Sequence, residues 1–509
     1  MKKIISIETL AKTISKLKAR GKKVVLCHGV FDLLHIGHIN HFKEAKKLGD
    51  ILVVTVTQDK FVNKGPNRPI FLLNTRMESI AALKDIDYVA PNMFSNAIQL
   101  IKMLKPNIYC KGKDYKNYNL DATNQIKKEA LAIKSVGGRI IHTETVLFSS
   151  SKIINQTNLN LSNEQKYFIN KIKKNKEFST DNKILSTMNS FSDLKVLVIG
   201  ETIIDEYVFC EALGKSGKEP ILVLRDMYKE RYLGGTGAIA RNLSSFCKQI
   251  TLLTNIGQKN EEKKFIENHL QKNINTVFLN KKKSTTITKK RFIEDINKTK
   301  IFGVYSLNDQ PLDKEQENIF NAKILKNINN HDLVIVSDYG HGLISDKTAK
   351  LIVKKSKFVA VNTQLNSSNL GFHVISKYIG ANLITINEIE MRHELRNKTE
   401  HRVSLIKTLS KKLKSKYIHV TSGDEGSNIY NTSTKEIISC PAFANRVIDK
   451  VGTGDSMLAI LAISLYKKFD VKFSMFLSAL VAAQNIQNMA NKTPINKINI
   501  TRALQSYLK

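Results

Sequence analysis

Tryptophan is absent from the 509-residue chain, and aromatic residues make up only 7% of it. Acidic residues are also few, because 45 Asp and Glu stand against 80 Lys and Arg, which gives a formal net charge of +35. The lysines are spread over the whole chain, and neither an RNP-like aromatic pattern nor a dense basic tail accompanies them. We therefore do not expect nucleic acid as a partner, and a field of this sign would attract nucleotides and sugar phosphates.

Cysteines and long apolar runs are scarce as well. The cysteines are scattered and odd in number, which argues against a disulfide framework and fits a reducing cytoplasm. They are Cys27, Cys110, Cys210, Cys247 and Cys440. Apolar stretches such as "SMLAILAISLY" are too short to span a bilayer. The stretch "MKKIISIETLAKTISKLKARGKK" predicts an amphipathic helix whose charges interrupt any signal-like core. We expect a cytoplasmic protein without a membrane span.

Strand patterns alternate with helical patterns along most of the chain. The hydrophobic fraction of 42% is typical of a globular protein, and the length calls for more than one core. In the first part, the expected strands are 24–30, 51–57, 88–90, 108–111 and 139–143. Such alternation predicts a parallel sheet covered on both faces, with ligands beyond the carboxyl ends of its strands.

The amino-acid composition changes between residues 156 and 190. This stretch is polar and lysine-rich, with one short helical pattern around 164–174, and it indicates a connector. A second alternating region begins at "DLKVLVIGETIIDEY", and three helical segments close the chain. The prediction is an α/β protein with domains at 1–155 and 191–509, joined by 156–190.

The stretch "FDLLHIGHINHFKEAKKLGD" places two histidines where a strand passes into a helix. Backbone N–H groups and the positive end of the helix dipole suit an anion there, and Gly37 lets the backbone approach it. His35 and His38 add donors that can follow charge developing on phosphate oxygens. Zinc is the alternative, but the nearby Cys27 and His28 lie on a strand without a CxxC partner.

"GVFDLLHIGH" resembles the HxGH signature of cytidylyltransferase-like nucleotidyltransferases. Class I aminoacyl-tRNA synthetases share that motif, but a KMSKS-like loop is not evident. The stretches "LGDILVVTVTQDKFVNKGPNRPI", "NTRMESIAALKDIDYV", "KGKDY" and "FSSSKII" follow in the same order as in sugar-phosphate nucleotidyltransferases. The resemblance implies that Lys46 joins the two histidines in catalysis. It also implies nucleotide contacts at Gly29, Phe31, Asp32, Arg76, Lys111, Asp114, Ser149 and Ser150.

A second anion-binding turn is expected in "DKVGTGDSMLAILAISLYKK". Gly452 and Gly454 open backbone N–H groups at a helix N-terminus, which can receive a transferring phosphoryl group. Asp455 stands one residue further on, placed to accept a proton from a substrate hydroxyl. A glycine-rich turn with an aspartate helix cap is the alternative.

This turn resembles the DTxGAGD signature of the ribokinase-like (PfkB) carbohydrate kinases, with Lys450 in place of Thr and Thr453 in place of Ala. The segments "GETIIDEY", "YLGGTGAIARNL", "TITKKRF", "SDYGHG", "NEIE" and "VTSGDEG" follow in the family's order. The resemblance implies substrate contacts at Asp205, Gly234, Gly235, Asn242, Lys289 and Arg291. It also implies that Asn387 and Glu390 help to hold Mg²⁺ and phosphates, and that Thr421, Gly423 and Gly426 lie near ATP.

Both halves are most similar to the bifunctional heptose kinase/adenylyltransferases of lipopolysaccharide-core synthesis, in which the kinase comes first. Three positions depart from that pattern: Ala238 stands in place of an Asn, His341 in place of a Lys, and "VNTQ" (361–364) in place of Asp-Pro-Lys. A polar mismatch at such places strongly penalises a wrong substrate. The kinase is therefore expected to prefer another sugar, or to be weakened.

These patterns together predict a bifunctional enzyme of activated-sugar synthesis. One half would transfer a nucleotidyl group to a sugar 1-phosphate with release of pyrophosphate, and the other would phosphorylate a sugar or sugar phosphate with MgATP. ATP is the first choice of nucleotide for the N-terminal half and CTP stays open, as do the sugar and a homodimer. The alternatives are a cytidylyltransferase forming a CDP-alcohol beside a degenerate kinase, and a non-catalytic nucleotide- or RNA-binding protein.

Overall fold

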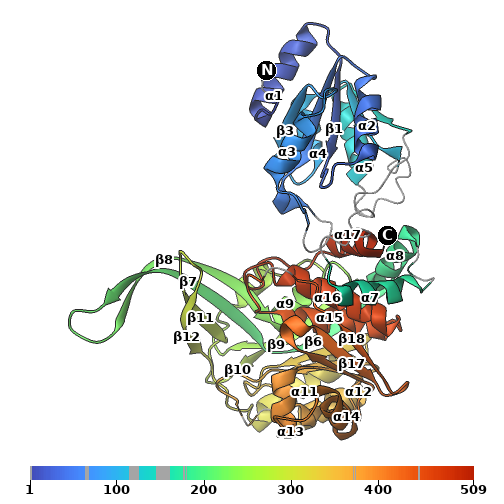
Figure 1. The fold of residues 1–509 in the computed structure, drawn as a ribbon. Coiled ribbons are helices and arrows are strands. Elements are labelled where there is room, and N and C mark those ends of the chain that lie inside the picture. The colour runs from blue at the N-terminus through green and yellow to red at the C-terminus, as the bar shows by residue number, and fades with distance from the viewer. Residues whose placement is uncertain are drawn as a thin grey trace. The chain divides into compact units, whose positions relative to one another are not determined.

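The computed structural model describes residues 3–62, 68–113, 125–144, 161–175, 178, 180–370, 372, 374–444 and 447–508. The chain forms two compact units, one of Met1–Ser186 with Ile498–Lys509 and one of Thr187–Lys497. Each unit contains strands that alternate with helices (Figure 1), which confirms the predicted α/β class. The predicted limits at 155 and 190 stay a prediction, and the terminal helix α17 (Lys497–Leu508) falls almost wholly in the first unit.

The first unit contains a five-stranded parallel sheet of order β3-β2-β1-β4-β5. Its strands are β1 (Val24–Gly29), β2 (Ile51–Thr57), β3 (Tyr88–Asn92), β4 (Ile108–Lys111) and β5 (Arg139–His142). Its helices are α1 (Ile7–Ala19), α2 (Ile36–Lys46), η1 (Asp59–Phe61), α3 (Leu73–Ala81), α4 (Ala97–Leu104), α5 (Gln125–Ser135) and α7 (Asn163–Lys173). The five predicted strands and the helix at the start of the chain are thus confirmed.

Alternation along β1 decides which helix each side chain meets. Val24 and Leu26 belong to a buried cluster that also contains residues of α1, α4 and α5. Val25 and Cys27 point to the opposite face, where the cluster contains residues of α2 and α3. The sheet is therefore covered on both faces, and α2 lies over the face that carries Cys27.

The expected connector is more helical than its polar composition suggested. The pattern around 164–174 forms α7, which opens with a capping box between Ser162 and Gln165. A further helix, α8 (Asp181–Asn189), follows, and its Ile184 and Met188 are buried. These two apolar residues lie four positions apart, on one helix face, but the polar residues around them hid the signal.

The second unit contains a nine-stranded sheet of order β10-β9-β6-β13-β14-β15-β16-β17-β18. These strands are β6 (Lys195–Gly200), β9 (Gln249–Gly257), β10 (Ile274–Lys281), β13 (Leu333–Asp338), β14 (Val359–Thr363), β15 (Leu383–Asn387), β16 (Tyr417–Thr421), β17 (Ser427–Asn431) and β18 (Glu436–Cys440). Neighbours are parallel from β10 to β16, while β17 and β18 pair in antiparallel fashion.

Helices cover this sheet on both faces. One large buried cluster joins it to α11 (Lys314–Ile328), α12 (Asp346–Lys355), η6 (Ile375–Tyr378), α13 (Glu388–Leu395) and α14 (Arg402–Leu413). The other helical segments are η5 (Ser190–Asp193), α9 (Thr236–Leu243), α10 (Lys263–Asn268), η7 (Gly423–Glu425), α15 (Thr453–Tyr466) and α16 (Val471–Asn485). The apolar run "SMLAILAISLY" lies in α15, which is buried on nearly all sides. In the described residues, no helix has the length and apolarity needed to cross a bilayer.

A second, four-stranded sheet of order β12-β11-β7-β8 completes this unit. Its strands are β7 (Thr202–Lys215), β8 (Leu222–Gly235), β11 (Thr288–Glu294) and β12 (Lys300–Ser306). Strands β7 and β8 form a long hairpin whose tip extends away from the rest of the unit (Figure 1). The base of this sheet carries the predicted substrate residues of β7, β8 and β11.

Candidate active sites

The two histidines of the "HIGH" turn stand at the start of α2, as expected. His35 is the N-cap residue, and its Nδ1 accepts a hydrogen bond from the Gly37 N–H at 3.1 Å. A nitrogen that accepts carries no proton, so the Nε2 of a neutral His35 is left to donate. The ring of His38 stacks on that of His35, with 3.9 Å between their centroids. The turn thus combines two imidazoles with the first N–H groups of a helix, which suits a phosphate.

Gly29 and Phe31 shape the wall beside these histidines. Phe31 has a left-handed backbone (φ 50°), and its ring packs edge-on against His38 at 5.3 Å. A Cβ on Gly29 would come within 2.9 Å of that ring, so the position requires a glycine. Phe31 therefore packs directly against His38, and Gly29 leaves room for the Phe31 ring.

Asp32 and Arg76 hold loops together at the carboxyl end of the sheet. Asp32 is buried and accepts from the backbone N–H groups of residues 70 and 71 at 2.7 and 3.1 Å. It also pairs with Arg68 at 3.2 Å. The buried Arg76 guanidinium donates to the carbonyls of residues 30, 57 and 71 and to Asp59. These contacts support the loops of the site, and a contact with the nucleotide stays a prediction for both residues.

The structure does not place Lys46 beside the histidines. Its Nζ donates to the carbonyl of Asp50 at 2.7 Å and to the carboxylate of Asp87 at 2.5 Å. Asp87 also accepts from the N–H of Leu52, at the start of β2. At about 1.5 Å of rise per residue, α2 carries Lys46 roughly 12 Å beyond His38. Two helical turns thus take this lysine away from the anion site.

Lys111 reaches the end of β1 from the end of β4. It is buried, and its Nζ lies 3.3 Å from the carbonyl of His28 and 3.6 Å from Glu129. Burial, together with the Lys111 charge, lowers the pKa of His28 to about 3, so this imidazole is neutral. The Nδ1 of His28 contacts the Thr55 hydroxyl at 3.1 Å. Three further predicted residues lie outside the described ranges: Asp114, Ser149 and Ser150.

In the second unit, α15 begins at the predicted glycine turn. Gly452 caps the helix with φ 78°, and a Cβ there would come within 2.1 Å of the Asn491 side chain. Gly454 is exposed, and nothing lies within 4 Å of where its Cβ would be. The first turn of α15 therefore offers its N–H groups in open space, as an incoming phosphoryl group requires.

Asp455 lies in that first turn and receives two hydroxyl donors. Tyr339 donates to its carboxylate at 2.8 Å and Ser337 at 3.3 Å. Burial raises the pKa of Asp455 to about 6, and the two hydrogen bonds oppose that rise. The carboxylate is therefore mostly ionised at neutral pH yet close to the range in which a general base works well.

Asp205, on β7, is held by glycine and arginine neighbours. Its carboxylate accepts from the Arg291 guanidinium of β11 at 2.5 Å. A Cβ on Gly234 would come within 2.2 Å of its Oδ2, and one on Gly235 within 2.4 Å of the Glu201 carbonyl. Lys289 of β11 is the register partner of Asp205 and is buried. The Lys289 ammonium lies over the rings of Tyr305 and Tyr339 at 5.6 and 5.7 Å.

The Asp455 carboxylate and the Lys289 ammonium belong to one site. The nearby Lys289 charge opposes the rise in the pKa of Asp455, and Asp205 adds to that rise. Asn242, in contrast, is buried and accepts from the backbone N–H of Ile495 at 3.1 Å. That bond ties α9 to the chain after α16, so substrate contact by Asn242 stays a prediction.

The "NEIE" segment forms a helix cap, a role that the sequence analysis did not predict. Asn387 and Glu390 make a reciprocal capping box at the start of α13. The second carboxylate oxygen of Glu390 accepts from the Leu365 N–H at 3.1 Å, and burial raises the pKa of Glu390 to about 7. Both carboxylate oxygens of Glu390 thus accept backbone hydrogen bonds, and the role of Asn387 and Glu390 in holding Mg²⁺ and phosphates stays a prediction.

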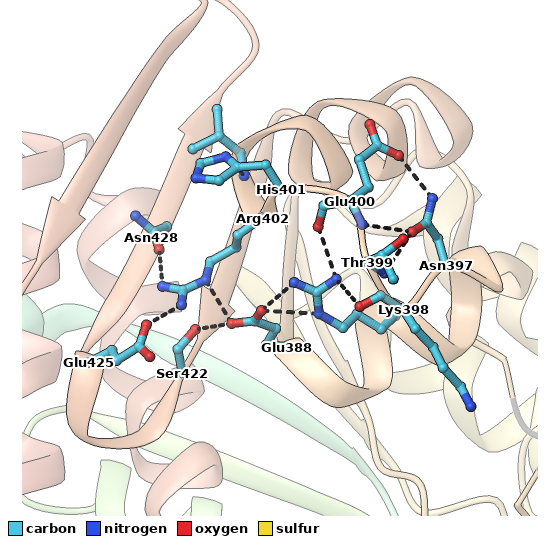
Figure 2. Close-up of polar contacts among 12 residues, drawn as sticks. Glu388, Asn397, Lys398, Thr399, Glu400, His401, Arg402, Ser422, Glu425 and Asn428 are labelled. Carbon is cyan, nitrogen blue, oxygen red and sulfur yellow. Dashed lines mark hydrogen bonds and ion pairs between the residues drawn. The ribbon is translucent and has the colours of Figure 1, made fainter.

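The expected nucleotide loop follows β16 and is tied to α13 and α14 (Figure 2). Glu388 accepts hydrogen bonds from Arg392 at 2.7 Å and from Ser422 at 2.9 Å, and it forms an ion pair with Arg402 at 2.6 Å. Arg402 also binds Glu425, inside the loop. This network therefore fixes the loop to α13 through Ser422 and to α14 through Glu425.

Three predicted residues lie on or beside that loop. Thr421 ends β16, while Gly423 and Gly426 follow with φ 62° and 85°. A Cβ on Gly426 would come within 2.2 Å of the carbonyl of Cys440. The glycines therefore fit the shape of the loop, and their contact with ATP stays a prediction.

Sequence reasoning missed the group that holds the turn after β13. Glu201 is fully buried and accepts from the N–H groups of Tyr339 and His341 at 3.0 and 3.2 Å. Burial and the nearby charge of Asp338 together raise the pKa of Glu201 to about 7. A charged residue directly after a buried strand was the available signal.

Two of the three departures from the family pattern lie in the packed interior, whereas the third, at 361–364, is half-buried at Asn362 and exposed at Gln364. Ala238 is 1% exposed and His341 is 1% exposed. The side chain of Asn362 donates to the carbonyl of Thr385, and the backbone N–H of Gln364 donates to the carbonyl of Asp338. Each departure therefore has a defined place in the fold, and the expected change of kinase substrate stays a prediction.

Sequence models of two families match the two halves of the chain. The pfkB family carbohydrate kinase model matches residues 193–498, which is more than half of the chain, and the chain belongs to this family. A cytidylyltransferase-like model matches residues 26–156. From the sequence, the kinase domain was expected to come first in the relatives, so that the order in this chain would be reversed. These matches do not bear out that expectation, because they give no order of domains in the relatives.

Curated relatives match parts of the chain. It is 28% identical over 280 residues to the bifunctional protein HldE of Campylobacter jejuni (strain RM1221), covering 54% of this chain and 58% of that one. It is 37% identical over 154 residues to the bifunctional protein HldE of Blochmanniella pennsylvanica (strain BPEN), covering 30% and 31%. The chain thus spans a little over half of the length of the first of these relatives.

Among solved structures, the chain is similar to phosphofructokinase-2 from Escherichia coli in complex with potassium. The match covers 62% of this chain and 100% of that one, with a TM-score of 0.51 and 12% sequence identity. This likeness supports the ribokinase-like fold of the second unit and nothing finer.

Proposed function

We propose that this chain is a bifunctional enzyme of activated-sugar synthesis. The first unit would transfer a nucleotidyl group to a sugar 1-phosphate and release pyrophosphate, and the second would phosphorylate a sugar or sugar phosphate with MgATP. The observation that carries the proposal is that each unit has its own helix N-terminus with reactive side chains. These are His35 and His38 at α2, and Asp455 at α15.

Nucleotidyl transfer at α2 needs no covalent intermediate. The sugar phosphate attacks the α-phosphate of the nucleotide in line, and pyrophosphate leaves on the opposite side. His35 presents an Nε2–H and His38 stacks beside it, so both can donate to oxygens that gain charge in the transition state. Asp32 and Arg76 would keep the surrounding loops in place.

Phosphoryl transfer at α15 would use Asp455 as the general base. It would take the proton of the attacking hydroxyl, while the N–H groups of the first turn receive the transferring phosphoryl group. Asp205 accepts hydrogen bonds and would orient the sugar hydroxyls. Mg²⁺ would arrive with the nucleotide as MgATP.

The substrates follow from the resemblance and from charge. Lys289 places a cation near Asp455, while Arg291 is paired with Asp205, and the cation favours a phosphorylated, heptose-like sugar over a neutral one. ATP is the proposed nucleotide for the first unit. Glu144 stands where glycerol-phosphate cytidylyltransferases carry an Arg, which favours ATP, and CTP stays open. We further propose a cytoplasmic location and a role in lipopolysaccharide precursors; a homodimer stays open.

A matrix of substrates tests the proposal. Full-length protein is incubated with each nucleoside triphosphate and each of a panel of sugar 1-phosphates, and with MgATP and a panel of sugars and sugar phosphates including heptose 7-phosphate. Mass spectrometry should find a nucleotide sugar in the first series and a new sugar phosphate in the second. Failure of every pair in one series would remove that activity from the proposal. Formation of a CDP-alcohol would support the cytidylyltransferase alternative.

A further inference from the structure

Three soft side chains that are far apart in the sequence come together inside the first unit. Cys27 lies on β1, Cys110 on β4 and His41 on α2, and one potential ligand atom from each lies within 4.8 Å of the others. All three residues are buried. This group lies outside the residues to which the proposed nucleotidyl transfer assigns a role.

Strand register explains why the two thiols are neighbours. Cys27 and Cys110 are paired residues on adjacent parallel strands, so both side chains leave the sheet on the same face. Helix α2 covers that face, since Phe42 and Ala45 belong to the same buried cluster as the two cysteines. His41, next to Phe42, is thereby brought over the thiol pair.

The hydroxyl of Thr143 orients the imidazole of His41. The Nδ1 of His41 lies 2.9 Å from the hydroxyl of Thr143, which leaves Nε2 as the other donor atom. Thr143 is itself fixed by a backbone hydrogen bond to the carbonyl of Lys111 at 2.9 Å. Histidines that bind metals usually have such a partner on their second ring nitrogen.

The local charge is compatible with a divalent cation once the thiols ionise. Two thiolates neutralise a dication, so the bound centre carries no net charge toward Lys111, which also pairs with Glu129 at 3.6 Å.

We propose that Cys27, Cys110 and His41 bind a transition-metal ion of the zinc class. Two thiolates and one imidazole form a Cys₂His set that suits Zn²⁺, with the fourth tetrahedral position left to a non-protein donor. Binding forms two metal–sulfur bonds and one metal–nitrogen bond, and releases the two thiol protons to solvent without any change of oxidation state. The ion would join β1, β4 and α2 one helical turn from His38, and so would position the "HIGH" turn.

Cobalt provides the direct test because its complexes with thiolates absorb light. Reduced, full-length protein is stripped with a chelator and titrated with Co²⁺, and the experiment is repeated with Cys110→Ala, His41→Ala and the control Cys247→Ala. Cys247 is also a buried thiol, but it lies in the second unit. We expect one Co²⁺ per chain with a thiolate-to-metal absorption band, unchanged in Cys247→Ala, weakened in His41→Ala and abolished in Cys110→Ala. Absence of the band in the parent protein overturns the proposal.

A second measurement uses only the parent protein, in case the variants fail to fold. Zn²⁺ should slow alkylation of Cys27 and Cys110 at least tenfold, as measured by peptide mass spectrometry, and leave the rate at Cys247 unchanged. Equal rates with and without Zn²⁺ contradict the proposal, as does a Cys27–Cys110 disulfide that persists when Zn²⁺ is present. Neither experiment depends on nucleotidyl transfer, so the proposed function and the metal site can fail separately.

Discussion

Asp455 illustrates how single residues tune the second site. Burial disfavours its charged form, whereas the hydroxyls of Tyr339 and Ser337 favour it, and the resulting pKa of about 6 lies just below neutral pH. Since the charged form of an acid is the base, any change that raises this pKa reduces the active fraction at pH 6 to 7.

Tyr339→Phe removes one of those hydrogen bonds and keeps the ring. The pKa of Asp455 should rise, so the acidic limb of the kinase pH profile should shift to higher pH, while the plateau at alkaline pH changes much less. The measurement is kcat/KM for the sugar as a function of pH. Tyr378→Phe is the matched control, because that buried hydroxyl donates to Asp338 at 2.6 Å. A profile of Tyr339→Phe identical to that of the parent would show that Asp455 does not govern the acidic limb.

Gly234 has a role that a single added carbon can test. Its alanine Cβ would lie 2.2 Å from the Asp205 carboxylate, which must then move away from Arg291. Gly234→Ala should raise the kinase KM for the sugar by roughly tenfold or more, in line with about 1–3 kcal/mol for a lost polar contact. Gly217→Ala, where the new Cβ has nothing within 4 Å, should leave KM unchanged. Equal KM values for both variants would remove Asp205 from sugar binding.

At the scale of elements, α2 has a different task along each part of its length. Its first turn carries His35 and His38, its middle carries His41 over the thiol pair, and its last turn binds Asp87 through Lys46. The start of α2 therefore forms part of a candidate anion site, and its end is held by the ion pair between Lys46 and Asp87. This arrangement separates His35 and His38 from the lysine that the family resemblance grouped with them.

Paired substitutions on α2 test that separation. His38→Ala should lower pyrophosphate release by about 10²–10³-fold, because it removes one donor to the developing charge. Lys46→Ala should change the rate by no more than a few fold, since a half-exposed ion pair contributes about 0–1 kcal/mol. The readout is pyrophosphate release from a sugar 1-phosphate and the nucleotide found by the substrate matrix. A loss with Lys46→Ala as large as that with His38→Ala would return this lysine to the active site.

At the scale of the whole molecule, each unit has its own sheet and its own candidate site. Asp455→Asn should reduce sugar phosphorylation by about 10²–10⁴-fold, as for the loss of a general base, and leave nucleotidyl transfer intact. His38→Ala should have the opposite pattern. Both reactions are measured on both full-length variants. Loss of nucleotidyl transfer in a folded Asp455→Asn protein would contradict two independent sites.

Local sequence was sufficient for much of the architecture. The strands at 24–29, 51–57 and 108–111 were predicted almost to the residue, because short apolar runs between turn residues have few alternatives. The turns before α2 and α15 were also found, since a glycine at a helix start with a polar neighbour is a local signal. The helix α8 escaped because its two buried residues stand among polar ones.

The sequence by itself therefore determined the order of elements, the two helix N-termini and the residues that stand on them, because all of these depend on neighbours along the chain. Only the tertiary structure decided the rest. Strand register placed Cys27 beside Cys110, the packing of α2 brought His41 to them, and the turn after β13 brought Tyr339 to Asp455. The length of α2 took Lys46 away from the histidines. Contacts between distant segments depend on register and packing, which no single stretch of sequence specifies.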